Sequence, residues 1–544
     1  VATCAQPTEN TYYVSATLGS DTEGTGSKDC PFATIQKSLD VIATAAISSG
    51  EIRIAAGTYE TTEPIQILAG ISIKGGYSAT DWADRAYLTS AERATAKYKT
   101  LVKYTGTYDG AYSPPDTMDP VYTMGAKDAN TTASTIIEGL TINAKETGVF
   151  VAALVSLEGA APTIQYNTIN GAIVGADASV ALGAQNGDIK NNTINGGTST
   201  GMSMGIMALG ADISVSDNEI DAGISDSSTY GMMIYSATNA LILSNNVNGG
   251  TANDHTAALV VTASSSVTLN GNQINPGTCA SGGATGVNLT QGTSGTVSDN
   301  TFSGGRGKTT SSVMLSNSAT AEISGNTIEA ATADDDGHGI DLYNAGDAKI
   351  FNNTIIGAIT TNQSSMVINV SGPTSPLIAN NTLIGGNSAF FSVIIYLYQG
   401  GGGWIENNII FSEYMGTSGI NAADVDSGAT AVKNNAFSGT TVYFNGAAMY
   451  DYATVGEFET AGVVPEASGN TQDFVIGGAT AQAKDAFQDY DAKNFRLSAN
   501  ASTTVIEGGL DLSSDGFTVD KDGVTRNAPW SIGAYESNIL SRSR

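Results

Sequence analysis

The chain is poor in charge, and in basic residues above all. Only 14% of its 544 residues are charged, and 52 acidic residues against 23 basic ones give a net charge of −29. This negative charge disfavours nucleic acid and anionic membranes as partners. No hydrophobic run is long enough for a transmembrane helix, so we expect no membrane insertion. Gly, Ser, Thr, Ala and Asn dominate, a composition typical of secreted bacterial surface proteins.

Cysteine is also scarce, with only Cys4, Cys30 and Cys279 present. Cys4 and Cys30 both lie in the N-terminal segment, and we predict a disulfide between them. A disulfide fits an oxidising, extracellular compartment. Two free thiols are the alternative. Cys279 is expected to fill a small apolar space.

An asparagine recurs at intervals of 25 to 28 residues through the middle of the chain. After Asn167 the series comprises Asn192, Asn218, Asn246, Asn272, Asn300, Asn326, Asn353, Asn381, Asn408 and Asn435. A fixed period predicts a solenoid, in which each unit buries its apolar face against its neighbours. We expect the asparagine at a sharp turn, where it tolerates left-handed backbone and stacks into an amide ladder. Ligand binding by this column is the alternative, which the regularity of the series disfavours.

Short runs of alternating apolar and polar residues separate the asparagines. In Gly339-Ile340-Asp341-Leu342-Tyr343 the alternation has a period of two, which predicts a strand with one buried face. Gly, Ser, Asn and Asp mark the turns between such runs. No helical stripe long enough for an α-solenoid occurs in residues 136–440. The repeat therefore predicts an all-β fold, a parallel β-helix with one repeat in each rung.

The two ends of the chain differ from the middle. A helix is predicted to begin at Pro31, with a buried face that comprises Phe32, Ile35, Leu39 and Ile42. This helix would cover the open apolar end of the solenoid, which otherwise invites aggregation. The predicted organisation is an N-terminal cap with the first strands (1–77), an inserted loop excursion (78–135), a body of about twelve rungs (136–440) and an irregular C-terminal cap (441–544).

The repeats resemble the right-handed parallel β-helix repeats of the pectin-lyase-like superfamily, the PbH1 type. The segments Tyr13-Val14-Ser15 and Gly75-Gly76-Tyr77 are similar to the entry region of many bacterial surface members. The run Ile532-Gly533-Ala534-Tyr535-Glu536 is similar to the end of members labelled choice-of-anchor Q. The resemblance covers nearly the whole chain and implies a single-stranded right-handed β-helix. It says little about activity, because this fold hosts lyases, hydrolases, adhesins and inert fibres.

One cluster offers the residues that a superfamily lyase would need, a base beside an acidic calcium site. Lys308 and Asp334 each lie eight residues after a repeat asparagine, so we expect them one rung apart. The candidate catalytic residues are Lys308, Arg306 and His338, and the candidate calcium ligands are Asp334, Asp335 and Asp336. A solvated turn with ion pairs of about 0–1 kcal/mol each is the alternative that we favour. Calcium is the only cofactor that this cluster suggests.

Aromatic residues on the outward face offer a binding surface for sugar rings or another protein, formed by Tyr235, Tyr343, Tyr396 and Tyr398. Cover by residues 78–135 is the alternative. We predict a secreted bacterial protein with a structural or adhesive role at the cell surface or in an extracellular filament. Its partners would be further copies, joined head to tail, or a surface glycan. The alternatives are a polysaccharide lyase or hydrolase acting on acidic glycans, and a non-catalytic glycan-binding protein.

Overall fold

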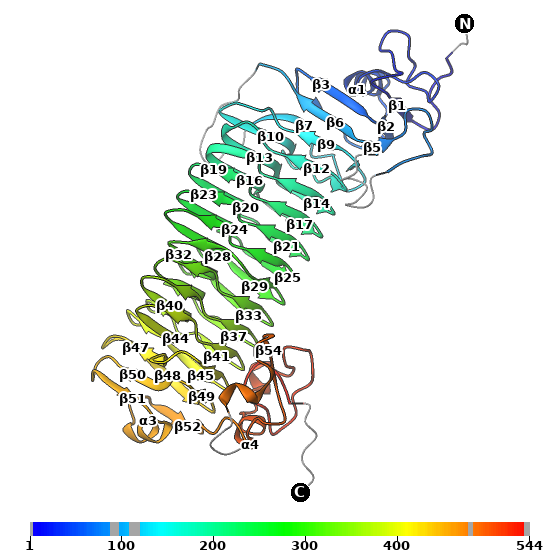
Figure 1. The fold of residues 1–544 in the computed structure, drawn as a ribbon. Coiled ribbons are helices and arrows are strands. Elements are labelled where there is room, and N and C mark those ends of the chain that lie inside the picture. Colours follow the sequence, from blue (N-terminus) through cyan, green and yellow to red (C-terminus); the bar gives the residue numbers. More distant parts are fainter. Residues whose placement is uncertain (1–3, 87–96, 108–119, 211, 477–481, 538–544) are drawn as a thin grey trace. The chain divides into compact units, whose positions relative to one another are not determined.

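The chain is an all-β, right-handed parallel β-solenoid of about 12 turns, with 6% of its residues in helices. The computed structural model describes residues 4–86, 97–107, 120–210, 212–476 and 482–537. Contacts within the chain divide it into two compact units, unit 1 (Val1–Val260 and Ser264–Val267) and unit 2 (Val261–Ala263 and Thr268–Arg544). Figure 1 follows the chain from blue to green through unit 1 and from green to red through unit 2.

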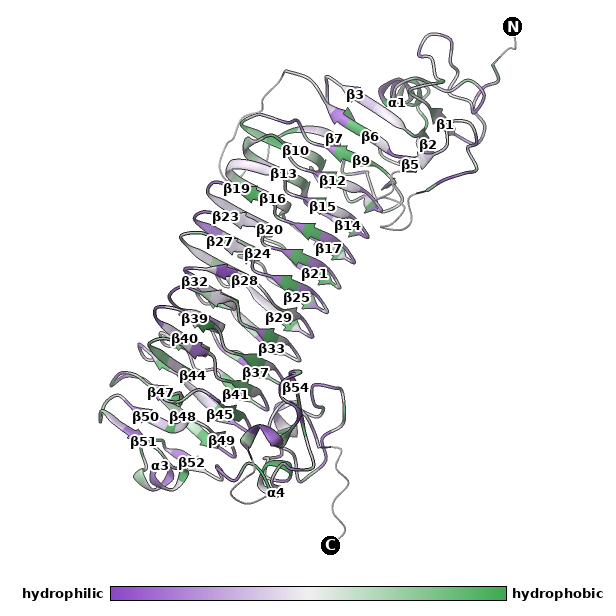
Figure 2. Cartoon of the chain, in the orientation of Figure 1, coloured by the Kyte–Doolittle hydropathy of each residue, from purple (hydrophilic) through white to green (hydrophobic). Residues whose placement is uncertain are grey.

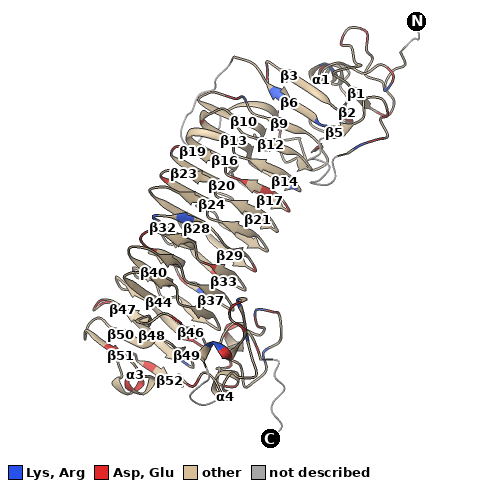
Figure 3. Ribbon diagram, viewed as in Figure 1, with Lys and Arg blue, Asp and Glu red and all other residues tan. Residues whose placement is uncertain are grey.

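Each rung contributes strands to three parallel sheets, named here in chain order the first, second and third sheet. In β36 (Gly337–Tyr343), Ile340 and Leu342 are fully buried, whereas Asp341 and Tyr343 lie on the opposite face. Inward apolar residues are buried between the sheets. In Figure 2 the hydrophobic colour lies mainly on the strands and the hydrophilic colour on many of the turns. Figure 3 shows how little of the ribbon carries charge. None of the helices among the described residues has the length and hydropathy to cross a membrane.

Unit 1 contains most of the early strands. Its first sheet comprises β1 (Thr11–Val14), β2 (Gly50–Ala55), β5 (Ile71–Tyr77), β8 (Ile136–Glu138), β11 (Thr163–Gln165), β14 (Gly187–Lys190), β17 (Asp212–Ser216) and β21 (Asn239–Leu243). Its second sheet comprises β3 (Gly57–Thr61), β6 (Thr100–Tyr104), β9 (Thr141–Asn143), β12 (Thr168–Asn170), β15 (Thr193–Asn195), β18 (Glu219–Asp221) and β22 (Asn246–Asn248). Its third sheet comprises β4 (Ile65–Gln66), β7 (Val121–Ala126), β10 (Phe150–Ser156), β13 (Ala176–Ala184), β16 (Thr198–Leu209), β19 (Ile224–Ser225), β20 (Ser228–Tyr235), β23 (Thr251–Ala252) and most of β24 (His255–Thr262).

Unit 2 repeats this arrangement. Its first sheet comprises most of β25 (Val267–Asn270), β29 (Ser294–Ser298), β33 (Thr320–Ser324), β37 (Ala348–Phe351), β41 (Leu377–Ala379), β45 (Gly402–Glu406), β48 (Gly428–Lys433) and β52 (Glu466–Ser468). Its second sheet comprises β26 (Gln273–Asn275), β30 (Thr301–Phe302), β34 (Thr327–Glu329), β38 (Thr354–Ile356), β42 (Thr382–Ile384), β46 (Ile409–Phe411) and β49 (Ala436–Ser438).

The third sheet of unit 2 contains the long strands β28 (Gly283–Thr290), β32 (Thr309–Ser316), β36, β40 (Ser364–Ser371), β44 (Phe391–Tyr398), β47 (Ser418–Ala422) and β50 (Thr441–Asn445). Its shorter strands are β27 (Thr278–Cys279), β31 (Arg306–Gly307), β35 (Thr332–Ala333), β39 (Ile359–Thr360), β43 (Asn387–Ser388) and β51 (Tyr450–Tyr452). Outside the three sheets lie α4 (Thr503–Ile506), two 3₁₀ turns (Ala483–Ala486 and Ser513–Asp515) and the antiparallel pair β53 (Phe487–Asp489) and β54 (Asn494–Leu497).

The N-terminal helix α1 (Ile35–Thr44) begins later than the predicted Pro31. Thr34 is its N-cap, because the Thr34 hydroxyl accepts a hydrogen bond from the backbone N of Lys37 at 3.2 Å. Phe32 is buried in the segment before the helix, where it forms a β-bridge with Val14. The helix itself buries Ile35, Leu39 and Ile42. In the same part of unit 1, Cys4 and Cys30 form a disulfide, whereas Cys279 is a buried thiol in unit 2.

The prediction of one continuous excursion over residues 78–135 is wrong. Within this stretch, β6 pairs in parallel with β3 and β9, and β7 pairs in parallel with β4 and β10. The stretch therefore supplies two strands of an early rung. Residues 78–99 separate β6 from β5, and residues 105–120 separate β7 from β6, so these strands do not follow the period of the later repeats. Residues 87–96 and 108–119 of the predicted excursion lie outside the described residues.

The recurring asparagines form a hydrogen-bonded ladder within each unit. The ladder residues are Asn167, Asn192, Asn218 and Asn245 in unit 1, and Asn272, Asn300, Asn326, Asn353, Asn381, Asn408, Asn435 and Asn470 in unit 2. Asn353 Nδ2, for example, donates to the Ile323 carbonyl at 2.8 Å and to Asn381 Oδ1 at 3.0 Å. Its own Oδ1 accepts from the backbone N of Asn326 at 2.9 Å. Buried amides that are satisfied in this way stabilise every rung.

Two details of the predicted ladder are wrong. Asn245 occupies the row in place of Asn246, which is exposed at the start of β22. The residue that enters the core lies two positions after the ladder asparagine, and Val247 therefore fixes the ladder position at Asn245. The left-handed backbone also belongs to the residue before each ladder asparagine, such as Asn352 with a φ of 55°.

The solenoid of unit 2 continues past the predicted boundary at residue 440. β52 pairs with β48, and Asn435 Nδ2 donates to Asn470 Oδ1 at 3.1 Å. The helix α3 (Val455–Ala461) then covers the end of the core of unit 2. Its Phe458 is fully buried, with a ring centroid 4.9 Å from that of Tyr443.

Residues 507–536, here called the C-terminal arm, pack along the flank of unit 2 instead of covering its end. The side-chain amides of three left-handed asparagines donate to arm carbonyls at 2.7 to 2.9 Å, in the pairs Asn434–Gly508, Asn407–Leu510 and Asn352–Val519. Arg526 of the arm has a fully buried side chain, and its Nη1 lies 3.3 Å from Glu536 Oε2. The predicted C-terminal cap is therefore largely a cover for the sides of several rungs.

Candidate functional site

The predicted catalytic cluster is an exposed turn of unit 2. Lys308 and Asp334 lie in adjacent rungs, since the Asp334 N donates to the Gly307 carbonyl at 2.9 Å. The Lys308 Nζ nevertheless pairs with Asp335 Oδ2, at 3.7 Å, and Arg306 Nη2 pairs with Asp334 Oδ1, at 2.7 Å. Both basic side chains are 59% exposed. Such exposed pairs contribute little to stability, and their charges are screened by water.

The remaining members of this cluster have separate partners. Asp336 Oδ1 accepts from the backbone N of Ser364 at 3.1 Å. His338 Nδ1 lies 3.1 Å from the Thr310 carbonyl, so its Nε2 is the ring nitrogen left for other contacts. Across the described residues, no three His, Cys, Asp or Glu side chains form a group that could hold a metal ion. The structure thus does not bring Asp334, Asp335 and Asp336 together as joint ligands.

A more enclosed group of polar side chains lies on the outer face of the third sheet in unit 2. One residue on each of six successive long strands occupies the same register position. We call this set the outer column, and it comprises Asn288, Met314, Asp341, Asn369, Tyr396 and Asn421. Neighbouring members are about 4.8 Å apart along the sheet. The sheet therefore presents a regularly spaced row of side chains, which one elongated ligand could contact along its length.

Asp341 is the carboxylate of the outer column and is only 9% exposed. Asn369 Nδ2 donates to Asp341 Oδ1 at 2.8 Å, and Ser311 Oγ lies 3.5 Å from Oδ2. An ionised carboxylate only accepts hydrogen bonds, so Asn369 must turn its NH₂ group towards Asp341. Its Oδ1 then faces away, and it is a buried acceptor that has no hydrogen-bond partner among the described residues.

Asn421 presents a second acceptor of this kind. The residue is 5% exposed, and its Oδ1 likewise has no hydrogen-bond partner in the described part of the chain. Buried polar atoms are normally satisfied, and leaving one unpaired costs about 1–3 kcal/mol. Unpaired acceptors on an outward face therefore indicate a ligand or ordered solvent that donates hydrogen bonds.

Tyrosines flank the outer column. Tyr396 and Tyr398 are stacked, with ring centroids 5.8 Å apart and an interplanar angle of 24°. Phe391 meets Tyr396 edge-on at 5.9 Å. Burial raises the pKa of Tyr396, and electrostatic interactions with Tyr398, Asp424 and Asp336 raise it further. Tyr343 is 46% exposed on the same face.

The four predicted binding tyrosines therefore divide between the units. Tyr343, Tyr396 and Tyr398 belong to one face of unit 2, whereas Tyr235 belongs to unit 1. The sequence analysis missed Asp341, Asn369 and Asn421. Their signal is a polar residue between two buried ones in the same register of successive strands, as in Ile340-Asp341-Leu342 and Ile368-Asn369-Val370.

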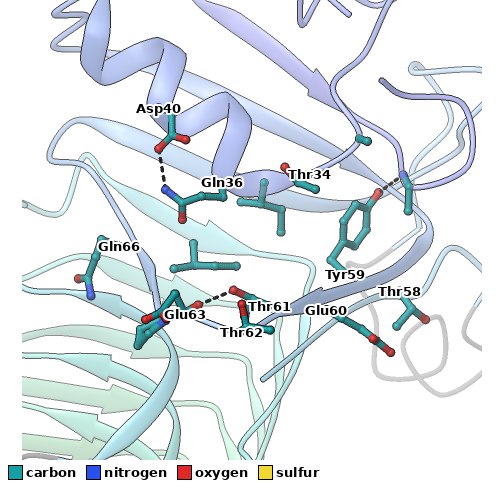
Figure 4. A pocket seen from close by; sticks show the side chains of 15 residues that line it. Thr34, Gln36, Asp40, Thr58, Tyr59, Glu60, Thr61, Thr62, Glu63 and Gln66 are labelled. Atoms are coloured by element: carbon teal, nitrogen blue, oxygen red, sulfur yellow. Dashed lines mark hydrogen bonds between the residues drawn. The ribbon is translucent and has the colours of Figure 1, made fainter. Parts of the chain in front are cut away.

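Unit 1 holds a separate cavity of about 730 Å³ between α1 and the strands β3 and β4 (Figure 4). Gln36 Nε2 donates to Asp40 Oδ1 at 2.8 Å on one wall. The hydroxyl of Tyr59 donates to the Ala55 carbonyl at 3.0 Å and accepts from Ala16 N at 3.1 Å. These polar groups satisfy one another, and the described lining contains none of the predicted site residues.

Comparison with known proteins supports the fold. Residues 224–383 match the family described as "Right handed beta helix region", and residues 17–254 match the family described as "Protein of unknown function (DUF1565)". A comparison with curated proteins finds no significant match.

Several solved structures are similar at low identity. The Dettilon tailspike protein (gp208) is 12% identical, with a TM-score of 0.34 over 79% of this chain and 67% of that chain. The complex of XylC with xylose is 11% identical, with a TM-score of 0.31 over 97% and 98%. The catalytic unit of the GH87 α-1,3-glucanase from Streptomyces thermodiastaticus strain HF3-3 is 13% identical, with a TM-score of 0.32 over 83% and 73%. Likeness at this level carries no argument about activity. The parallel rungs show that the fold is a right-handed β-helix, and the match over residues 224–383 agrees with this fold.

Proposed function

We propose that the protein binds carbohydrate through the outer face of the third sheet in unit 2, and that it serves in adhesion to a surface glycan. The main support for this proposal is the outer column, where unpaired amide oxygens lie beside stacked aromatic rings. Sugar hydroxyls donate hydrogen bonds to such acceptors, and the apolar faces of sugar rings pack against tyrosines. The rungs repeat every ~4.8 Å, so several sugar residues of one chain would contact the column together.

An extracellular location at a bacterial cell surface belongs to the same proposal. The Cys4–Cys30 disulfide is stable in an oxidising compartment. The low content of charge and the abundance of Gly, Ser, Thr and Asn are typical of secreted surface proteins. Adhesion to a glycan accounts for a site built on the outside of the solenoid.

A glycan array followed by calorimetric titration with each hit tests the proposal. We expect binding that falls at least tenfold in Tyr396→Ala, because stacked aromatic anchors dominate most binding sites. Tyr235→Ala is the matched control, since Tyr235 is an outward tyrosine of unit 1 and is 42% exposed. Loss of binding in the control but not in Tyr396→Ala would move the site to unit 1. Absence of binding to every glycan would refute the proposal.

A polysaccharide lyase acting at Lys308 is the catalytic alternative. The exposure of Lys308 and Arg306, and their pairing with different carboxylates, weigh against it. Uronate polymers incubated with calcium and monitored for unsaturated product test it directly. Turnover that disappears in Lys308→Ala would establish the lyase in place of a binding protein.

Head-to-tail self-association is the structural alternative. α3 covers the end of the core of unit 2, and its residue Phe458 is fully buried there. A covered end offers less apolar surface for stacking against another copy. This observation favours glycan binding, and light scattering over a range of protein concentrations would reveal filaments if they form.

A further inference from the structure

Three carboxylates in or next to the long strands of the third sheet in unit 2 lack a cationic partner. Asp336 precedes β36, Asp341 lies within it, and Asp424 follows β47. The bases of the nearby turn are already used, because Arg306 pairs with Asp334 and Lys308 with Asp335. Across the described residues, no ion pair joins Asp336, Asp341 or Asp424 to a basic side chain.

Asp336 and Asp424 both act on the same tyrosine. Their negative charges reach the Tyr396 phenol, whose pKa they raise in addition to the effects of burial and of Tyr398. The faces of the stacked Tyr396 and Tyr398 rings are also negative, because an aromatic ring has a quadrupole. A cation placed over these rings would be attracted by their negative faces.

The neutral groups of this face add hydrogen-bond acceptors. Asn369 donates a hydrogen bond from Nδ2 to Asp341, and its Oδ1 has no partner among the described residues. Asn421 is more than nine-tenths buried, and its Oδ1 also has no partner there. The Asp341 carboxylate and the amide oxygens of Asn369 and Asn421 therefore lie in one register row of the sheet. A ligand that fits this row must be rich in donors and must not be anionic.

We infer that the outer column binds a glycan with free amino groups, such as a deacetylated amino-sugar polymer. Ammonium groups meet Asp341 and the Tyr396 ring, while hydroxyls donate to the amide oxygens of Asn369 and Asn421. This inference rests on the proposed glycan-binding function and narrows it. Uronate polymers are repelled by the same carboxylates and by the net charge of −29.

Calorimetric titration at about pH 6, where amino sugars are protonated and exposed carboxylates are ionised, tests the inference. The probes are glucosamine, N-acetylglucosamine and galacturonate oligomers of equal length. We expect the glucosamine oligomer to bind at least tenfold more tightly than the N-acetylated one, and its affinity to fall with added salt. The galacturonate oligomer should show the weakest binding.

Variants identify the carboxylates. Asp341→Asn keeps the size of the side chain and should reduce the preference for glucosamine severalfold. Asp424→Asn, at a partly exposed position, gives a second measurement if Asp341→Asn does not fold. Asp226→Asn in unit 1 is the matched control and should change nothing.

The outcomes separate the two proposals. Equal or tighter binding of the N-acetylated or galacturonate oligomer would overturn the amino-sugar inference and leave glycan binding in place. A glucosamine preference that survives both Asp341→Asn and Asp424→Asn would also overturn it. Absence of binding to these oligomers and to every glycan of the array would remove the proposed function itself.

Discussion

The outer faces of the third sheet differ between the two units, although the rungs beneath them are built alike. In unit 1 this face carries a cluster of apolar side chains, among them Tyr122, Phe150, Val155, Met207 and Met233. In unit 2 the corresponding strands present the outer column, which holds three asparagines, one aspartate, one tyrosine and one methionine. Both units bury Ile, Leu and Val inside. The inside of a rung is thus constrained by packing, and its outside is free to acquire a function.

On the apolar face of unit 1, large side chains lie over smaller neighbours and shield them from solvent. Val155 is fully buried, although it alternates with the inward Leu154. Its neighbour Gly125 leaves room for the Tyr122 ring, since a Cβ at Gly125 would meet both Tyr122 and Val155 at under 3 Å. Large side chains that fold over small ones leave few polar groups for a ligand. In unit 2 the same face keeps its polar atoms near the surface.

The ladder gives the largest expected effect, and it should be equal in both units. Asn192→Ala in unit 1 and Asn353→Ala in unit 2 each leave a buried carbonyl and the amide groups of the preceding asparagine unpaired. We expect each to lower the free energy of unfolding by about 3–5 kcal/mol. Denaturant titration with hydrogen exchange read separately for each unit measures this. A cost confined to one unit would mean that the interiors are not equivalent.

The C-terminal arm belongs to unit 2 alone, and Arg526→Ala should loosen it. Removal of this guanidinium leaves Glu536 buried without its partner, at a cost of about 3 kcal/mol. Limited proteolysis should then cut within residues 507–536. Arg496→Ala is the control, because Arg496 pairs with Asp522 in an exposed position and should cost at most about 1 kcal/mol. Equal proteolysis of the two variants would contradict this view of the arm.

The arm also predicts a pH dependence. Burial lowers the pKa of Lys521 to about 8, against about 10.4 in an unfolded chain. Between these values the unfolded state binds a proton that the folded state lacks, so the free energy of unfolding rises with pH. We expect a gain of about 2 kcal/mol between about pH 7.5 and pH 10, and a flatter profile in Lys521→Met. A profile that falls over this window would be inconsistent with a buried amine.

The smallest effect tests the outer faces directly. Met207→Asn in unit 1 places an amide against the apolar cluster and should cost about 1–2 kcal/mol. Met314→Asn in unit 2 places the same amide between Asn288 and Asp341 and should cost less than about 0.5 kcal/mol. Thermal unfolding of the two variants measures the difference. A larger loss of stability in Met314→Asn than in Met207→Asn would contradict the proposed difference between an apolar outer face in unit 1 and a polar one in unit 2.

Periodicity in the sequence predicted the rungs, the parallel strands and the buried asparagines, because each depends on contacts repeated at a fixed interval. It did not predict the strands β6 and β7, which do not follow the period of the later repeats, or the course of the arm. Docking of the arm depends on contacts between residues more than 70 positions apart, such as Asn434 and Gly508. The doublets Asn352-Asn353, Asn380-Asn381, Asn407-Asn408 and Asn434-Asn435 do carry a signal for it.

In each doublet the second asparagine enters the ladder, and the first adopts left-handed backbone. Three of these first asparagines, Asn352, Asn407 and Asn434, hold the arm. For the site, the alternation placed Asp341 and the tyrosines on the outside. It did not reveal which amide oxygens lack a donor, because that depends on side-chain orientation in adjacent rungs.

Glu459 of α3 takes the position that the next ladder asparagine would have in unit 2. Its Oε1 accepts from both the backbone N and the Nδ2 of Asn470, at 3.0 and 2.9 Å. A carboxylate cannot donate, so it obliges Asn470 to point its NH₂ group towards the helix, and each earlier amide follows in turn. The helix thus gives the whole row a single polarity, with aligned dipoles that reinforce one another. The ladder could in principle continue through further rungs, and Glu459 on this short helix ends it.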